Sequence, residues 1–250
     1  MTTLLLDIGN THTHAALARG SRMGRPMDVP TRGWRNADAP RALLAWLASR
    51  RPDTAAFCSV VPAADAPLRR WLRREFNLAP LELTAATARG IMVDYPRPET
   101  IGADRLANAI AARHLFGAPV LVVDFGTAVT FDIVDRRGAY VGGVIAPGLS
   151  AMTDYLHEKT ALLPRIRIRE VRSAIGRSTE EAMLVGAVHG YRGLVRGLIG
   201  RIRGELGAAR LPVIATGGCA KLIARGVPEI RAVCPALTLE GLRLAATAQE

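Results

Sequence analysis

Two ten-residue segments of this chain match in residue type at each position: Leu4-Leu5-Leu6-Asp7-Ile8-Gly9-Asn10-Thr11-His12-Thr13 and Leu121-Val122-Val123-Asp124-Phe125-Gly126-Thr127-Ala128-Val129-Thr130. Each has three aliphatic residues, then Asp-x-Gly, then small or hydroxyl-bearing residues, and each is followed by a second apolar run. This pattern predicts a buried strand, a tight glycine turn and an antiparallel return strand. Because the pattern recurs about half a chain length later, it indicates two similar domains.

The surrounding sequence supports a duplicated α/β fold. In each half, three predicted strands precede alternating helices and strands, which is typical of a ribonuclease-H-like domain. Two such domains facing a central cleft are typical of the actin-like ATPases. We place the boundary at Gly117-Ala118-Pro119, which cannot continue a helix, so that the domains are 1–117 and 118–250. We expect a weak third strand at 27–34 and a loop at 84–101. Helices are expected at 39–50, 64–76, 104–115 and 239–248.

Composition indicates a globular protein of the cytoplasm. Of 250 residues, 49% are hydrophobic and 22% are charged, which is too apolar for a disordered chain. No apolar run reaches the roughly 18 residues that span a bilayer, and the N-terminus lacks the pattern of a signal peptide. Cys58, Cys219 and Cys234 have neither disulfide nor zinc spacing, which favours a reducing cytoplasm.

The formal net charge of +11 raises the alternative of nucleic-acid binding. However, the arginines are spread along the chain, and there is no helix-turn-helix or aromatic-rich basic patch. We therefore expect a solvated basic surface with weak, salt-dependent binding to DNA and no recognition of a specific sequence.

The two Asp-x-Gly segments have the chemistry of a phosphate site. A glycine turn after a strand presents backbone N–H groups to a phosphate, and a carboxylate such as Asp7 can hold Mg²⁺ through water. Asp-x-Gly-Asn alone is also compatible with an ordinary turn. The second copy, with Asp124 and Thr127, favours two hairpins that bind a polyphosphate.

A third motif, Thr216-Gly217-Gly218, lies between an apolar strand and a helix. Glycines there allow a flat ligand to lie against the backbone, although a plain strand-to-helix turn has the same pattern. The order Asp-x-Gly, Asp-x-Gly, Gly-Gly is the phosphate, phosphate and adenosine order of actin-like ATPases.

A fourth motif, Gly102-Ala103-Asp104-Arg105, opens a predicted helix after a loop rich in proline. Its charges are compatible with simple helix capping. In a substrate site, the Asp104 carboxylate would accept the proton of a hydroxyl group. Arg105 and the helix N-terminus would bind a substrate carboxylate.

Together these motifs resemble those of type III pantothenate kinase over the whole chain. The resemblance rests on Asp-Ile-Gly-Asn-Thr, on Tyr-x-Arg-Pro-x-x-x-Gly-Ala-Asp-Arg-x-Ala-Asn over 95–108, on Asp-Phe-Gly-Thr-Ala-x-Thr, and on Gly-Gly-x-Ile-x-Pro-Gly over 142–148. It implies ATP-dependent phosphorylation of pantothenate to 4'-phosphopantothenate, the first step of coenzyme A biosynthesis. It also implies Mg²⁺ with ATP, a monovalent cation, and a homodimer.

The resemblance assigns roles to individual residues. The ATP-binding residues would be Asp7, Gly9, Asn10, Thr11, Thr13, Thr127, Gly217 and Gly218. The pantothenate-binding residues would be Tyr95, Gly102, Ala103, Asp104, Arg105 and Thr179, with Asp104 as the proton acceptor. Asp124 would hold K⁺ or NH₄⁺. Ser178 stands where the family usually has Asn, so the turn before Thr179 is a point of difference.

Two other functions stay open at this point. One is an actin-like kinase for another small hydroxylated substrate, against which the 95–108 motif argues. The other is a non-catalytic regulator like the Bvg accessory factors, which resemble the same family.

A homodimer is expected from the helix that follows Thr179. Gly186, Gly190, Gly193 and Gly197 recur at three- and four-residue spacing, which suits close helix packing, although a monomer core can use the same spacing. In the expected dimer, Thr179 reaches the substrate of the partner subunit. We expect Ala182, Met183, Val185, Gly186, Val188 and His189 on the packed face.

Overall fold

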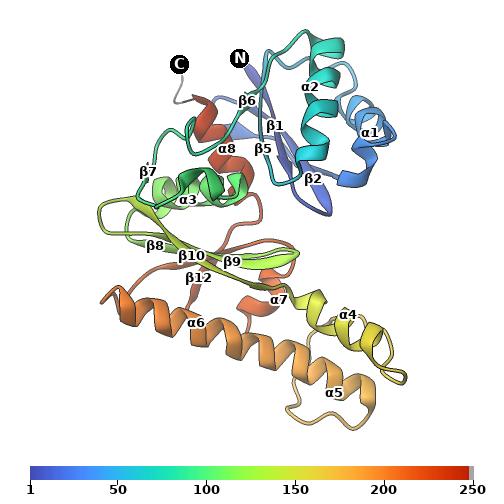
Figure 1. The fold of residues 1–250 in the computed structure, drawn as a ribbon, viewed down its shortest axis with the longest axis vertical. Helices are drawn as coiled ribbons and strands as arrows, with labels where there is room; N and C mark the ends of the chain where they lie inside the picture. Colours follow the sequence, from blue (N-terminus) through green and yellow to red (C-terminus); the bar gives the residue numbers. More distant parts are fainter. Residues whose placement is uncertain (248–250) are drawn as a thin grey trace. The chain divides into compact units, whose positions relative to one another are not determined.

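The computed structural model describes residues 1–247, which form two compact units. The first unit comprises Met1–Gly117, Gly138–Val141 and the described residues from Ala236 onward, and the second comprises Ala118–Arg137 and Gly142–Pro235. The C-terminal helix therefore packs with the first unit, although it follows the second in the chain (Figure 1). The division of the chain into two duplicated domains, 1–117 and 118–250, remains a proposal.

The first unit is built on a sheet with the order β3-β2-β1-β5-β6, in which β4 also pairs with β2. Strand β1 is antiparallel to β2 and parallel to β5. The strands are β1 (Thr2–Ile8), β2 (His12–Arg19), β3 (Arg22–Met23), β4 (Met27–Pro30), β5 (Thr54–Ser59), β6 (Leu81–Glu82) and β7 (Met92–Val93). The helices are α1 (Asp38–Leu47), α2 (Pro62–Phe76), α3 (Ala103–Phe116) and α8 (Leu237–Thr247), with short 3-10 turns at Thr31–Trp34 and Pro98–Thr100.

The centre of this unit is apolar on both faces of the sheet. Leu4, Leu5 and Leu6 of β1 have no exposed surface, which explains the unbroken aliphatic run in the sequence. Helices α3 and α8 lie side by side (Figure 1). A Cβ atom on Gly241 of α8 would overlap the backbone of Ala107 in α3, so this crossing requires glycine. The crossing fixes the position of α3, which carries Asp104 in its first turn.

The second unit repeats this topology. Its sheet has the order β12-β11-β8-β9-β10, with β8 antiparallel to β9 and parallel to β11. The strands are β8 (Val120–Phe125), β9 (Ala128–Val134), β10 (Ala139–Pro147), β11 (Val213–Thr216) and β12 (Ile230–Val233). The helices are α4 (Leu149–Lys159), α5 (Thr179–Val185), α6 (Tyr191–Glu205) and α7 (Ala220–Ala224), with a π-helical turn at Gly186–Gly190. The first residues of β10 belong to the first unit, where they pair with β7.

The two sheets correspond strand for strand. Strands β1, β2, β5 and β6 have the same order and directions as β8, β9, β11 and β12. The sequence prediction of a duplicated ribonuclease-H-like fold is therefore confirmed. Apolar side chains of α6, including Val195 and Ile199, pack on the second sheet against Leu121 and Phe131.

Several local predictions differ from the structure. The expected strand at 27–34 ends at Pro30 and continues as a 3-10 turn, in which Trp34 is buried against Trp71. The expected loop at 84–101 contains the short strand β7. Strands β6 and β12 were not predicted. Each forms by pairing with a neighbouring strand, β6 with β5 and β12 with β11. Within residues 1–247, no helix is both long and apolar enough to cross a membrane.

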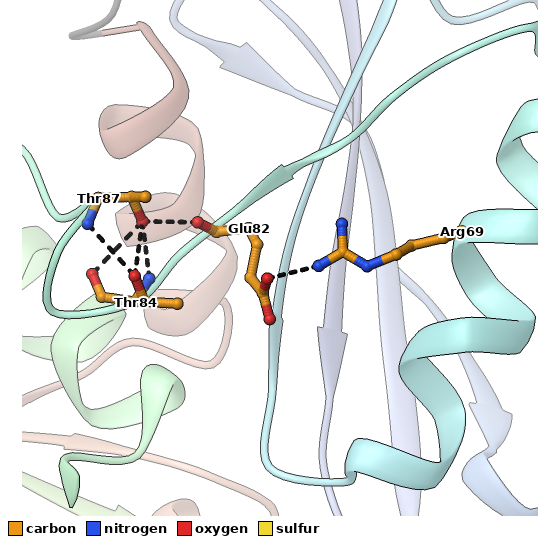
Figure 2. A network of polar contacts seen from close by, with 4 residues as sticks. All are labelled: Arg69, Glu82, Thr84 and Thr87. Carbon is orange, nitrogen blue, oxygen red and sulfur yellow. Dashed lines mark hydrogen bonds and ion pairs between the residues drawn. The ribbon is translucent and has the colours of Figure 1, made fainter. Parts of the chain in front are cut away.

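The start of the 84–101 segment is held by the polar contacts shown in Figure 2. The Thr87 hydroxyl donates to the backbone carbonyl of Glu82 at 2.6 Å, and the Thr84 N–H donates to Thr87 Oγ1 at 2.8 Å. The Glu82 carboxylate forms an ion pair with Arg69 of α2 (Figure 2). These contacts hold the beginning of the 84–101 segment, which carries Tyr95, against helix α2.

Candidate active site

The turn between β1 and β2 forms the first candidate phosphate site. The Gly9 N–H donates to the His12 carbonyl at 3.0 Å, which closes a tight turn and leaves Asn10 and Thr11 exposed. Thr31 donates from its hydroxyl to the Gly9 carbonyl at 2.7 Å. The exposed tip therefore has a braced backbone, as a phosphate-binding turn requires.

Thr13 lies beneath this turn. It has no exposed surface, and its hydroxyl lies 3.1 Å from the Thr31 hydroxyl and accepts from Trp34 Nε1 at 3.0 Å. The structure thus gives Thr13 a supporting role in the hairpin. Its expected contact with ATP stays a prediction.

Asp7 and Cys58 occupy paired positions near the ends of the parallel strands β1 and β5. The Cys58 thiol donates to Asp7 Oδ1 at 3.5 Å, the distance expected for a bond with sulfur as donor. Burial raises the pKa of Cys58 well above its ordinary value, and the charges of Asp7 and Asp104 act in the same direction. The thiol therefore stays protonated and remains a donor to the carboxylate.

Asp104 lies in the first turn of α3, close enough to Cys58 to influence its ionisation. Its Oδ1 atom accepts the backbone N–H of Arg105 at 2.8 Å. Burial raises the pKa of Asp104 above the ordinary aspartate value, while that hydrogen bond and the Arg105 charge oppose the change. A Cβ atom on Gly102 would lie only 2.7 Å from Asp104 Oδ1, so glycine leaves room for the carboxylate. In the first unit, the charges of Asp7 and Asp104 thus both act on the Cys58 thiol.

Arg105 and Tyr95 meet at Tyr140. The Arg105 Cζ atom lies 5.8 Å from the centre of the Tyr140 ring, and the Tyr95 ring lies 6.2 Å away at an interplanar angle of 61°. The two predicted substrate residues, ten positions apart in sequence, therefore share one buried aromatic neighbour.

The second hairpin joins β8 and β9 and is enclosed by glycines of the second unit. The Gly126 N–H donates to the Ala128 carbonyl at 3.0 Å. The Gly148 N–H donates to the Thr127 carbonyl at 3.2 Å, and a Cβ atom on Gly148 would overlap that carbonyl oxygen. This close approach explains the last glycine of the 142–148 motif.

The Gly217-Gly218 turn lies against the same hairpin. Gly217 has a φ of +90°, and a Cβ atom there would lie 2.5 Å from Asp124 Oδ1 and 2.6 Å from the Phe125 backbone nitrogen. A Cβ atom on Gly218 would meet nothing within 4 Å. The second unit therefore gathers Asp124, Thr127 and the glycine turn, with open space beside Gly218.

Thr179 begins α5 and is exposed. The Ser178 hydroxyl accepts the Glu181 N–H at 3.2 Å, and the Glu181 carboxylate accepts the Arg177 N–H at 2.7 Å. Serine thus caps this helix, as asparagine can, so the substitution at 178 leaves the helix start intact.

Sequence reasoning missed Cys58, Tyr140 and the packing role of Gly148. The position of Cys58 near the end of a predicted strand, with Asp7 near the end of another, was a usable signal because parallel strand ends lie at one edge of a sheet. Tyr140 had no such signal, because its role comes from the pairing of β7 with β10.

Comparisons with known proteins agree with these motifs. A family model described as type III pantothenate kinase matches residues 3–201. A type III pantothenate kinase of Akkermansia muciniphila is 49% identical over 248 residues, which cover 98% of each chain.

Solved structures show the same fold at low sequence identity. A Baf family transcriptional activator from Campylobacter jejuni has a TM-score of 0.63 and 18% identity, with 98% of each chain covered. A ROK family glucokinase from Streptomyces griseus, solved with glucose and AMPPNP, has a TM-score of 0.55 and 14% identity, with 99% of this chain and 100% of that chain covered.

Proposed function

Because this chain belongs to the type III pantothenate kinase family, we propose that it transfers the γ-phosphoryl group of ATP to the primary hydroxyl of pantothenate. The product is 4'-phosphopantothenate, and the reaction opens coenzyme A biosynthesis. The observation that carries the proposal is the group formed by Asp7 and Cys58, near the ends of β1 and β5, and by Asp104 in the first turn of α3, beside Arg105.

Asp104 is the residue that receives the substrate proton. A general base is most effective when its pKa approaches the working pH, and burial raises the pKa of Asp104 in that direction. Phosphoryl transfer has a loose transition state, so orientation of the hydroxyl is a large part of what this carboxylate contributes.

Pantothenate itself is held by residues on both sides of Asp104. Arg105 carries the charge that pairs with the substrate carboxylate. The Tyr95 ring contacts the same Tyr140 ring that the Arg105 guanidinium group contacts. Gly102 and Ala103 supply the backbone of the helix start. Tyr95 and the first turn of α3 thus contribute the proposed contacts with the substrate.

ATP contacts are assigned to Gly9, Asn10 and Thr11 in one hairpin and to Thr127, Gly217 and Gly218 in the other unit. Asp7 fits a Mg²⁺ ion because it lies near the end of β1, in the strand that leads into the turn with the exposed Asn10 and Thr11, and hard cations prefer oxygen ligands. Mg²⁺ bound with ATP would neutralise charge on the phosphates. Asp124, packed beside Gly217, is the residue that would hold K⁺ or NH₄⁺.

Two surfaces of the second unit support a homodimer. Glycines recur at four- and three-residue intervals along one line of the helix, and a Cβ atom on any of them would meet nothing within 4 Å: Gly186, Gly190, Gly193, Gly197, Gly200 and Gly204. Tyr155 is 61%, Leu162 90% and Ile175 76% exposed, although all three are large and apolar. A line of glycines with open space around them, together with exposed apolar residues in the same unit, suits a second copy of the chain.

The details of that face differ from the sequence prediction. Met183 and Val188 are buried within the second unit, so they belong to its own core. Gly186 and Ala182 are exposed, as the expected face requires. Thr179 precedes this helix line and is assigned to the substrate of the partner subunit.

We place the enzyme in the cytoplasm, a proposal supported by three cysteines without disulfides among the described residues. The function is tested by a coupled assay of purified protein with ATP, Mg²⁺, K⁺ and pantothenate, run beside glucose, N-acetylglucosamine and other hydroxyl acceptors. Activity on a sugar in place of pantothenate would overturn the proposal.

A further inference from the structure

Tyr140 lies at the start of β10 and has no exposed surface. It contacts two side chains that the proposed function assigns to pantothenate, Arg105 and Tyr95. No motif pointed to Tyr140, and its backbone and its ring contribute in different ways.

The backbone of Tyr140 holds the segment that carries Tyr95. Strand β7 pairs with β10 in parallel, with Val93 opposite Tyr140. The Asp94 N–H then donates to the Tyr140 carbonyl at 2.9 Å. The chain is therefore fixed to β10 at the residue immediately before Tyr95, at the end of a long irregular stretch.

The ring of Tyr140 holds the side chains. Its centre lies 5.8 Å from the Arg105 Cζ atom and 6.2 Å from the centre of the Tyr95 ring. A guanidinium group over an aromatic face is attracted by the ring quadrupole, and burial strengthens this attraction. The N–H donors of a guanidinium group match the two oxygens of a carboxylate, so the direction in which the group is held decides how it meets such a substrate.

We propose that Tyr140 is a positioning residue that aims Arg105 at the carboxylate of pantothenate and so sets the preference for an acidic substrate. The inference rests on the proposed function, and it names the residue through which the substrate site gains that selectivity. Tyr140 acts through Arg105 and Tyr95.

The test compares two acceptors with the same primary hydroxyl group. One is pantothenate, and the other is pantothenol, in which a neutral alcohol replaces the carboxylate. The ratio of their kcat/KM values measures the selectivity for the carboxylate. Tyr140→Leu should lower this ratio about five- to tenfold, the range of a buried cation–π contact, and leave the KM for ATP unchanged. Tyr140→Phe, which keeps the ring, should retain the ratio within about twofold.

Phe57→Leu is the matched control. Phe57 is fully buried and has the Arg69 Cζ atom 4.8 Å from its ring, so the change removes the same kind of contact away from Tyr95 and Arg105. It should leave the selectivity ratio at the wild-type value. In an Arg105→Met background, Tyr140→Leu should have no further effect on the ratio.

The outcomes separate the two claims. If wild-type protein does not phosphorylate pantothenate, the proposed function fails. If it does, and folded Tyr140→Leu loses equal activity on both acceptors, Tyr140 has a merely structural role and the inference is wrong. Should the leucine variant not fold, Tyr140→Met, with a flexible side chain that fills gaps, takes its place under the same criteria. Loss of selectivity in Tyr140→Phe would also overturn the inference.

Discussion

The thiol of Cys58 donates a hydrogen bond to Oδ1 of Asp7 at 3.5 Å, across neighbouring parallel strands. Both residues are buried, with Cys58 fully enclosed and Asp7 9% exposed. The bond fixes one oxygen of a carboxylate that the proposed function assigns to Mg²⁺ and ATP. It therefore links the packing of the first sheet to the chemistry of the site.

Two replacements of Cys58 test its hydrogen bond to Asp7. Cys58→Val removes the donor and adds one heavy atom to the side chain, so the KM for MgATP should rise about tenfold, since hydrogen bonds to charged groups contribute about 1.5–3 kcal/mol. Cys58→Ser keeps a donor and should stay within a few-fold of wild type. Steady-state kinetics at saturating pantothenate measure both, with Cys234→Val as a control for loss of a thiol elsewhere. Equal KM values in the valine and serine variants would contradict the role of the bond.

Asp104→Asn should lower kcat about 10²–10⁴-fold, the usual contribution of a general base. In wild-type protein, the acid limb of the kcat/KM profile should have an apparent pKa above the ordinary aspartate range, because burial raises the pKa of Asp104. A folded variant that turns over at a near-normal rate would remove Asp104 from the mechanism.

The same substitution should stabilise the fold at neutral pH. The pKa of Asp104 is higher in the folded state than its ordinary value of 3.8, so folding favours the protonated form. The ionised carboxylate therefore lowers stability once the pH rises through the folded pKa. Urea unfolding should show that the variant has the larger free energy of unfolding, and that its difference from wild type grows from acidic to neutral pH. A difference that shrinks over this range would contradict a raised pKa of Asp104 in the folded state.

Activity should require K⁺ or NH₄⁺, because a monovalent cation held by Asp124, as proposed, would reduce the repulsion between that carboxylate and the triphosphate. Wild-type protein in Na⁺ buffer free of both ions should lose most of its activity. Asp124→Asn should no longer respond to added K⁺. Full activity in Na⁺ alone would disprove the requirement.

Two inactive variants should rescue each other if the substrate site is shared between subunits. In a heterodimer of Asp104→Asn and Thr179→Arg, one site has both residues intact and the other carries both lesions. Random pairing should restore roughly a quarter of wild-type activity. An inactive mixture that contains verified heterodimers would refute the shared site, and a monomer by sedimentation would refute the dimer.

The duplication was predictable from sequence because it depends on local pattern. Aliphatic runs before Asp7 and Asp124 specify buried central strands, and the glycines after them specify turns, so both hairpins follow from short segments. The contacts within each site come from pairs distant in sequence. Cys58 reaches Asp7 over 51 positions through strand pairing, and Tyr140 reaches Tyr95 and Arg105 through the pairing of β7 with β10.

The C-terminal helix shows the same contrast between a local pattern, which the sequence reveals, and tertiary contacts, which it does not. The sequence predicted a helix at 239–248, but it did not indicate which element that helix contacts. Gly241 allows α8 to cross α3 closely, and Arg243 of α8 donates to the Gly20 carbonyl at 3.2 Å. Thr238 also donates to Asn108 at 2.9 Å. Such contacts depend on tertiary packing, which local propensity does not contain.

The most direct measurement is identification of the product by mass spectrometry and phosphorus NMR after incubation of the protein with ATP, Mg²⁺, K⁺ and pantothenate. Asp104→Asn serves as the control for a contaminating kinase. We predict a single phosphomonoester on the primary hydroxyl of pantothenate, formed by wild-type protein and nearly absent with the variant. Hydrolysis of ATP without this product, or equal product from both proteins, would contradict the account.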